Sequence, residues 1–308
     1  MPRPYPLWFV LALVVSLSFA RADNPSYADR FETVWQLVQE RYWDLERLGI
    51  DWQAVGRKYR PEALAAADDD AFYGVLEQMY REIGDDHSVF VPPARVEEIR
   101  NSYGDLPCLG VFLQRPAAHL GTIDYRLLPE GIGYIRLPDL ASAGTAANTR
   151  RAVRDLVRHQ ASALILDLRG NPGGRLVEMM QVAGIFTRGF LWRTITRWTL
   201  PLPYPTLGNV ETELPLAVLI DGGVNSAAEG LAGALQKRER ATIIGERSAG
   251  NVEAVLPFCL RDGSQAWIAT GVLAPIGGPT WEGRGVEPDI PTSSGGALKA
   301  AINFLRRP

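Results

Sequence analysis

Residues 163–186, ALILDLRGNPGGRLVEMMQVAGIF, contain an apolar run, a glycine-rich turn and a second apolar run in direct succession. The first run (163–169) predicts a buried strand, and the second (175–186) predicts a helix. The same order returns in residues 215–236, PLAVLIDGGVNSAAEGLAGALQ. A strand that leads through a tight turn into a helix, repeated along a chain, is typical of an α/β fold.

The segments around these two units continue the alternation. Residues 132–137 (IGYIRL) and 241–245 (ATIIG) predict strands, and residues 148–160 (NTRRAVRDLVRHQ) predict a helix. In such sheets, binding sites collect beyond the carboxyl ends of the strands, where both glycine-rich turns are expected to lie. We therefore expect an α/β domain over residues 131–308, with its site at the turns RGNPGG and DGGVNS.

A helical pattern precedes this domain. Apolar residues recur at helical spacing over residues 27–42 and again over residues 72–83, where three aspartates come just before the run and suit a helix N-terminus. We expect a small helical region over residues 23–95. Residues 96–130 show little periodicity and predict a linking segment.

The first 22 residues, MPRPYPLWFVLALVVSLSFARA, have the pattern of a secretory signal peptide: a basic Arg3, a short apolar stretch and an A-x-A site. An uncleaved anchor is the alternative, although the apolar stretch is short for a bilayer core of about 30 Å. The residue directly after the cleavage site is Asp23 and not a cysteine, which argues against a lipid anchor. We expect a mature chain that begins near Asp23, is exported to the periplasm or secreted, and has no membrane span.

The composition is that of a soluble globular protein, with 308 residues, 46% of them hydrophobic and 22% charged. The formal net charge is −3, and the charged residues form no basic stripe. This argues against a nucleic-acid partner. Cys108 and Cys259 are the two cysteines, and an oxidising compartment permits a bridge between them without requiring one. The oligomeric state stays open.

Ser226 has two compatible interpretations. Ser226 and Glu229 have the spacing of a capping box at the start of a helix. A serine at a strand-to-helix turn also projects its hydroxyl at the edge of the sheet, beside backbone N–H groups that can hold an oxyanion. Because a hydroxyl needs a base to become a nucleophile, the histidines decide between a cap alone and a catalytic residue.

The chain has three histidines. His159 ends a predicted helix and suits a surface position, and His119 lies in the weakly patterned linking segment. His87 lies in a loop, IGDDHSVF, between a helix and an apolar run, with acids and a serine beside it. It is the best candidate for a general base.

Five motifs occur in one order: IGDDHS, DLRGNPGG, DGGVNSAAE, IIGERSAGN and WEGRGVEPDI. Together they resemble the C-terminal processing (tail-specific) peptidases and the tricorn protease core, and the resemblance extends over most of residues 25–292. It implies a Clp-protease/crotonase-like α/β catalytic domain preceded by a small helical region. It also implies serine peptidase chemistry with no metal and no cofactor.

The family that this sequence resembles uses two different sets of catalytic residues. Processing peptidases pair the serine with a lysine, but Asn251 stands at that position here, and the chain's lysines are Lys58, Lys237 and Lys299. The tricorn-like branch uses a histidine and a glutamate, which correspond to His87 and Glu282. The tricorn-like style therefore fits this sequence better.

The resemblance implies that Ser226 attacks a peptide carbonyl while His87 takes its proton. Glu282 supports the site, with Asp86 as the other carboxylate that could support His87. The N–H groups of Ala227 and of Gly173 or Gly174 form the oxyanion hole.

The stretch between the histidine motif and the catalytic sheet is short for the PDZ domain that processing peptidases usually carry. We therefore expect peptides or unfolded protein segments to enter directly as substrates. A non-catalytic protein that binds ligands or peptides on the same scaffold is the chief alternative, and a scaffolding role is a third.

Overall fold

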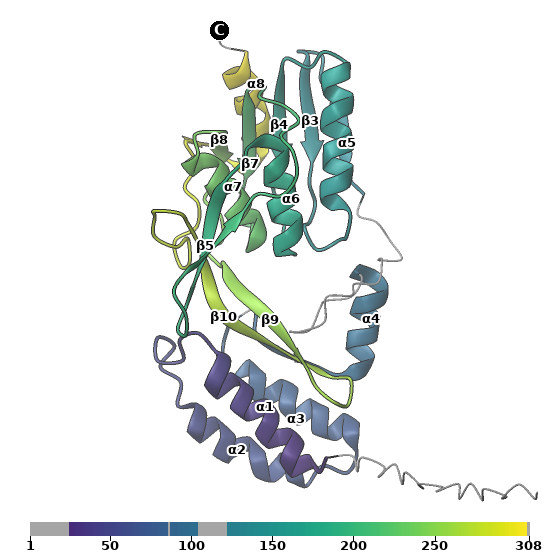
Figure 1. Ribbon diagram of the computed structural model, residues 1–308, viewed down its shortest axis with the longest axis vertical. Coiled ribbons are helices and arrows are strands. Elements are labelled where there is room, and N and C mark those ends of the chain that lie inside the picture. The colour runs from purple at the N-terminus through teal and green to yellow at the C-terminus, as the bar shows by residue number, and fades with distance from the viewer. Residues whose placement is uncertain (1–24, 86, 104–121, 307–308) are drawn as a thin grey trace, which may run out of the picture.

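The computed structural model describes residues 25–85, 87–103 and 122–306. An α/β layer and a helical bundle lie at opposite ends of the molecule, and a second sheet runs between them (Figure 1). Among these residues, no helix combines the length and the apolar character that a bilayer crossing requires.

A six-stranded sheet contains the strands that the sequence predicts. Its order is β11-β8-β7-β4-β3-β2, and all neighbours are parallel except β2 and β3. The strands are β2 (Asp124–Leu127), β3 (Ile132–Arg136), β4 (Ala163–Asp167), β7 (Leu216–Ile220), β8 (Thr242–Gly245) and β11 (Ile290–Pro291). The predicted α/β fold is confirmed.

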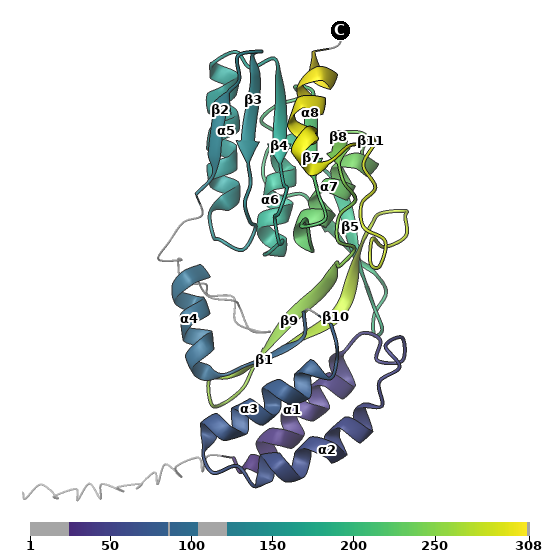
Figure 2. The ribbon, with the colours of Figure 1, turned by 180° about the vertical axis from the view of Figure 1, so that it is seen from behind.

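Helices cover both faces of this sheet. They are α5 (Thr145–Arg158), α6 (Leu176–Phe186) and α7 (Ala227–Lys237) on one face, and α8 (Ala297–Leu305), after a short 3-10 turn (Ser294–Gly296), on the other (Figure 2). Strand β4 shows why both faces are apolar: Leu164 and Leu166 pack toward the first group, whereas Ala163 and Ile165 pack toward α8. A strand buried on both faces has a continuous apolar sequence, as observed.

A second sheet was not predicted from the sequence. It is antiparallel, with the order β1-β10-β5-β6, and β9 pairs with β10. Its strands are β1 (Val89–Val91), β5 (Phe190–Thr196), β6 (Leu202–Pro205), β9 (Glu253–Cys259) and β10 (Gln265–Pro275). Strands β9 and β10 form a long arm between the α/β layer and the helical bundle (Figure 1).

The helical bundle contains the two predicted helices and one more. Helices α1 (Tyr27–Arg41), α2 (Trp52–Leu64) and α3 (Asp69–Arg81) enclose an apolar core that also takes in Ala266, Ile268 and Ala269 of β10. Asp68 caps α3 by accepting from the N–H of Ala71, so the aspartates lie at the positive helix end as expected.

A further helix, α4 (Pro93–Tyr103), extends into the stretch that was expected to be a linking segment. Proline is well suited to the first turn of a helix, and Pro93 is the first residue of α4. Residues 104–121 lie outside the described ranges, and the boundaries proposed at 95 and 130 are not tested by the elements around them.

Candidate active site

Ser226 lies between β7 and α7 and is the N-cap residue of the helix. Its φ of 53° and ψ of −122° are unusual for a residue with a side chain, and such a backbone costs about 1–3 kcal/mol. The N–H group of Ser226 donates to the Asn251 carbonyl (2.9 Å) and to Glu229 Oε1 (3.2 Å). The predicted strand-to-helix turn therefore exists, and it holds Ser226 in a strained conformation.

Glu229 does more than cap the helix. Its side chain is fully buried and accepts hydrogen bonds from Ser248 Oγ (2.5 Å) and from the N–H groups of Gly250 (2.7 Å) and Asn251 (2.9 Å). Burial is the largest influence on this carboxyl and raises its pKa above the ordinary value, while the donors oppose that rise. Glu229 thus fastens the loop 248–251 to the start of α7.

The loop 248–251 in turn holds the loop 281–286. Ser248 Oγ accepts from the Val286 N–H (2.7 Å), and the Gly283 N–H donates to the Gly250 carbonyl (2.7 Å). The loop that carries Glu282 is therefore connected to Ser226 through a short series of hydrogen bonds.

The turn RGNPGG lies directly against Ser226. A Cβ at Gly173 would lie 2.8 Å from the Ser226 Cβ and 2.9 Å from the Ala227 nitrogen. The Gly173 N–H already donates to Asn171 Oδ1 (2.8 Å), whereas the N–H groups of Gly174 and Ala227 have no partner within the described part of the chain. Of the predicted oxyanion donors, this geometry favours Gly174 and Ala227, with Gly173 giving the turn its close fit.

His87 lies in a loop that is tied to the second sheet. Asp85 accepts hydrogen bonds from the N–H groups of His87 (3.1 Å) and Ser88 (2.5 Å) and from the Ser88 hydroxyl (2.8 Å). Ser88 Oγ also accepts from the N–H of Ala269 in β10 (3.0 Å). The predicted base is therefore positioned by its own motif and by β10.

The carboxylate beside His87 is Glu253, the first residue of β9. His87 Nδ1 lies 3.5 Å from Glu253 Oε2, which is an ion-pair distance, and both atoms are buried and have no hydrogen-bond partner among the described residues. The second oxygen of Glu253 accepts from Trp43 Nε1 (3.0 Å) and from the Tyr42 hydroxyl (3.4 Å). Glu253 is thus oriented with one oxygen toward the imidazole.

The electrostatics of this pair favour the charged forms. Burial, the largest influence on His87, lowers its pKa, but Glu253, Asp85 and Glu282 together outweigh burial, and the pKa is raised above the ordinary value. Burial likewise acts to raise the pKa of Glu253, but contacts with His87 and Trp43 bring it below the usual range. A positive imidazole is therefore well stabilised here.

Glu282 lies near this pair but is held by other groups. Its Oε2 accepts from the Val252 N–H (2.9 Å), and its Oε1 accepts from Arg47 Nη2 (3.3 Å). It influences His87 through its charge.

Three consecutive residues join the parts of this site. The carbonyl of Asn251 accepts from Ser226, the N–H of Val252 donates to Glu282, and the carboxylate of Glu253 faces His87. The segment 251–253 therefore contacts the Ser226 turn, Glu282 and His87 in succession, while no hydrogen bond joins Ser226 to His87 among the described residues.

Three residues considered in the sequence, Asp86, Cys108 and His119, fall outside the described residues. The role of Asp86 therefore stays a prediction, and a bridge between Cys108 and Cys259 stays open. His159 lies exposed at the end of α5, with Nδ1 2.8 Å from the Asp155 carbonyl, as a surface residue would.

Glu253 was missed in the sequence. The one available signal was an acid between apolar residues in NVEAVL, directly after the SAGN turn. Because the second sheet was not predicted, nothing indicated that this acid begins a strand that passes His87.

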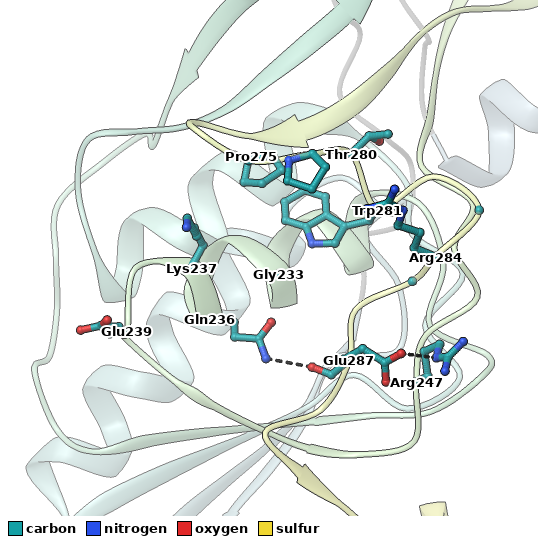
Figure 3. A pocket seen from close by; sticks show the side chains of 14 residues that line it. Gly233, Gln236, Lys237, Glu239, Arg247, Pro275, Thr280, Trp281, Arg284 and Glu287 are labelled. Atoms are coloured by element: carbon teal, nitrogen blue, oxygen red, sulfur yellow. Dashed lines mark hydrogen bonds and ion pairs between the residues drawn. The ribbon is translucent and has the colours of Figure 1, made fainter.

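A pocket of about 700 Å³ lies between α7 and the loop 281–286, which carries Glu282 (Figure 3). Trp281 forms one wall and packs on Gly233, where a Cβ would come within 2.4 Å of the indole Cε2. The contact connects the loop 281–286 to the middle of α7. In the described ranges, no group of three or more His, Cys, Asp or Glu side chains is arranged to hold a metal ion.

Comparison with known protein families identifies the family of this chain. The model of peptidase family S41 matches residues 131–292, which is more than half of the chain. The chain belongs to peptidase family S41. The tricorn protease C1 domain matches residues 23–81 of this S41 chain, within the helical region.

Curated relatives of this S41 chain include processing proteases. A carboxy-terminal-processing protease of Bartonella bacilliformis is 32% identical over 205 residues, which cover 62% of this chain and 45% of the relative. A carboxyl-terminal-processing protease of Synechocystis is 36% identical over 136 residues, which cover 44% of this chain and 32% of the relative. The matched regions thus span less than half the length of these relatives.

Solved structures share the fold of the S41 chain. The photosystem II D1 C-terminal processing protease superimposes with a TM-score of 0.67 at 19% identity, over 92% of this chain and 98% of that one. The tricorn protease superimposes with a TM-score of 0.53 at 16% identity, over 92% of this chain and 37% of that one.

Proposed function

We propose that this S41 chain is an exported serine peptidase that hydrolyses peptide bonds in peptides or unfolded protein segments. The single observation that carries the proposal is the contact between His87 and Glu253, joined through the segment 251–253 to the strained serine at the start of α7. Family membership and the processing proteases among the relatives support the same chemistry.

In the proposed mechanism, Ser226 Oγ attacks the peptide carbonyl and His87 takes its proton. Because Nδ1 of His87 faces Glu253, the other ring nitrogen, Nε2, is the atom left for the serine. His87 then gives the proton to the leaving amine, and it activates the water that releases the acyl group. Glu253 orients the ring and stabilises its positive form, and Glu282 adds negative charge nearby.

The long distance between His87 and Glu253 fits a site without substrate. Hydrogen bonds between catalytic groups are often long in free enzymes and shorten when substrate binds. The N–H groups of Gly174 and Ala227 are the proposed donors to the oxyanion, and each such donor is worth about 2.7–4 kcal/mol.

We also propose the domain organisation expected from the sequence: a signal peptide over residues 1–22, a helical region over 23–95, a linking segment over 96–130 and a peptidase domain over 131–308. Export follows from the signal pattern in the first 22 residues. We further propose that substrates enter the active site directly, without capture by a PDZ domain.

Cleavage of a broad library of unstructured peptides by the purified mature chain tests the proposed function. The wild type should cut, and Ser226→Ala and His87→Gln should each leave the library intact while remaining folded by circular dichroism. A folded wild type that cuts nothing, yet binds peptides, would instead favour the non-catalytic alternative.

A further inference from the structure

His87 is surrounded by negative charge. Asp85 lies within its own loop, Glu253 lies on β9, and Glu282 lies on the loop 281–286, and all three act to raise the pKa of the imidazole. The side chains of Glu253 and Glu282 are only 3% and 11% exposed. Two negative carboxylates so poorly solvated repel each other, and a cation close to both offsets this repulsion.

Arg47 supplies that cation from the helical region. Its Nη2 lies 3.3 Å from Glu282 Oε1 and 3.8 Å from Glu253 Oε1. No other Lys or Arg of the described ranges is within ion-pair distance of either glutamate. Arg47 therefore bridges the two carboxylates that face the catalytic histidine.

The segment that follows α1 holds Arg47 in this place. The guanidinium lies over the Trp43 ring, 4.6 Å from its centroid, and the Arg47 N–H donates to Asp44 Oδ1 (3.0 Å). Trp43 itself donates to Glu253 Oε1, the oxygen that Arg47 also approaches. The indole and the guanidinium thus act on one carboxylate as a unit.

We propose that Arg47 is a positioning residue, which holds Glu253 and Glu282 side by side and limits the negative charge that His87 experiences. The inference rests on the proposed function, because it assigns a role within the same site. It makes the helical region a part of the active site and not only a support for it.

The direction of the effect follows from the charges around the imidazole. Groups that face His87 are Asp85 from its own loop, Glu253 from β9 and Glu282 from the loop 281–286, and the Tyr42 hydroxyl lies beside Glu253. Removal of Arg47 leaves the acids uncompensated, which stabilises the protonated imidazole. The pKa of His87 then rises, and activity that needs neutral His87 begins at a higher pH.

NMR titration of the histidines in the intact mature chain tests the inference directly. The chain has only three histidines, so the His87 signal is assigned by its loss in His87→Gln. We expect Arg47→Gln to raise the His87 pKa by about half a pH unit, because the Arg47 side chain is 41% exposed and its charge is partly screened. Arg47→Lys, which keeps the charge, should restore most of the wild-type value.

Arg57→Gln is the matched control. Arg57 lies in the same helical region, its side chain is 70% exposed, and within the described ranges its ion pair is with exposed Asp51. It should leave the His87 pKa unchanged. Glu282→Gln should lower the His87 pKa, and the double variant with Arg47→Gln should return it toward the wild type.

A folded Arg47→Gln protein whose His87 pKa equals that of the wild type would overturn the inference, as would an equal shift in Arg57→Gln. Because titration does not depend on cleavage, this result is separate from the test of the proposed function. If the enzyme is active, the acidic limb of the pH profile of kcat/KM in Arg47→Gln should shift to higher pH together with the His87 pKa. A lower kcat without this shift would indicate that Arg47 has a purely structural role.

Discussion

Gly173 lies against Ser226 so closely that a Cβ on the glycine would stand 2.8 Å from the Cβ of the serine. The φ of Gly173, 91°, is also one that residues with side chains rarely adopt. The two glycine-rich turns of the chain therefore meet in a space with no room for an extra carbon.

The first prediction follows from this contact. Gly173→Ala should reduce kcat/KM at least 100-fold, because the turn must move away from Ser226 and Ala227 and the oxyanion donors lose their places. Gly222→Ala in the neighbouring turn is the control, since a Cβ there meets nothing within 4 Å. Equal kinetics for both variants would refute the assigned role of the turn.

The pH dependence gives a second prediction. Since the pKa of His87 is raised, kcat/KM should increase with pH through an apparent pKa above the value of about 6.5 that is usual for histidine. Glu253→Gln removes a charge that favours the protonated ring, so the acidic limb should move to lower pH while kcat falls by up to about 10⁴-fold. An acidic limb that stays in place in Glu253→Gln would show that Glu253 does not act on the base.

The same pair affects stability. The folded-state pKa of His87 exceeds its unfolded value, so its contribution to stability is present below the unfolded pKa and is lost as pH rises through the folded one. The stabilisation of wild type relative to His87→Gln should therefore shrink as the pH rises above the ordinary histidine pKa of about 6.5. Urea unfolding at several pH values measures it.

Alanine substitutions at two glycines should have opposite effects on stability. Gly233→Ala should destabilise the protein by about 1–3 kcal/mol and lower activity, because the new Cβ would lie 2.4 Å from Trp281, the neighbour of Glu282. Gly74→Ala, in α3, meets no atom within 4 Å and should stabilise the protein by about 0.5–1 kcal/mol. Thermal unfolding distinguishes the two, and a stabilised Gly233→Ala would contradict the packing described for Trp281.

The buried carboxylate of Glu229 gives a further prediction. Glu229→Gln keeps the size of the side chain but replaces one acceptor oxygen with a donor, which faces the N–H groups and hydroxyl that the carboxylate now binds. We expect a loss of about 1.5–3 kcal/mol in the free energy of unfolding, together with reduced activity. Glu239→Gln, on an exposed residue just after the same helix, should change neither.

The sequence predicted the parallel sheet well because its strands are buried on both faces, and residues such as Leu164 and Ile165 leave a continuous apolar run. Short motifs likewise led to Ser226, His87 and the RGNPGG turn, since tight turns require particular residues locally. These features depend on a few neighbours along the chain.

The second sheet has a weaker hydrophobic pattern in the sequence. Strand β9 is partly exposed and has Glu253 and Pro257 within it, so its sequence does not alternate cleanly. The pairing of Glu253 with His87, 166 residues earlier in the chain, depends on that strand crossing to the helical region. The role of Arg47 could not be predicted from the sequence either, because its partners, Glu253 and Glu282, lie in two later segments of the chain.

Mass spectrometry of the mature chain after reaction with a fluorophosphonate tests whether Ser226 is the nucleophile. We expect one adduct on Ser226, absent from Ser226→Ala and strongly reduced in His87→Gln and Glu253→Gln. A folded wild-type protein that stays unlabelled, or that carries the adduct on another serine, would contradict this role of Ser226.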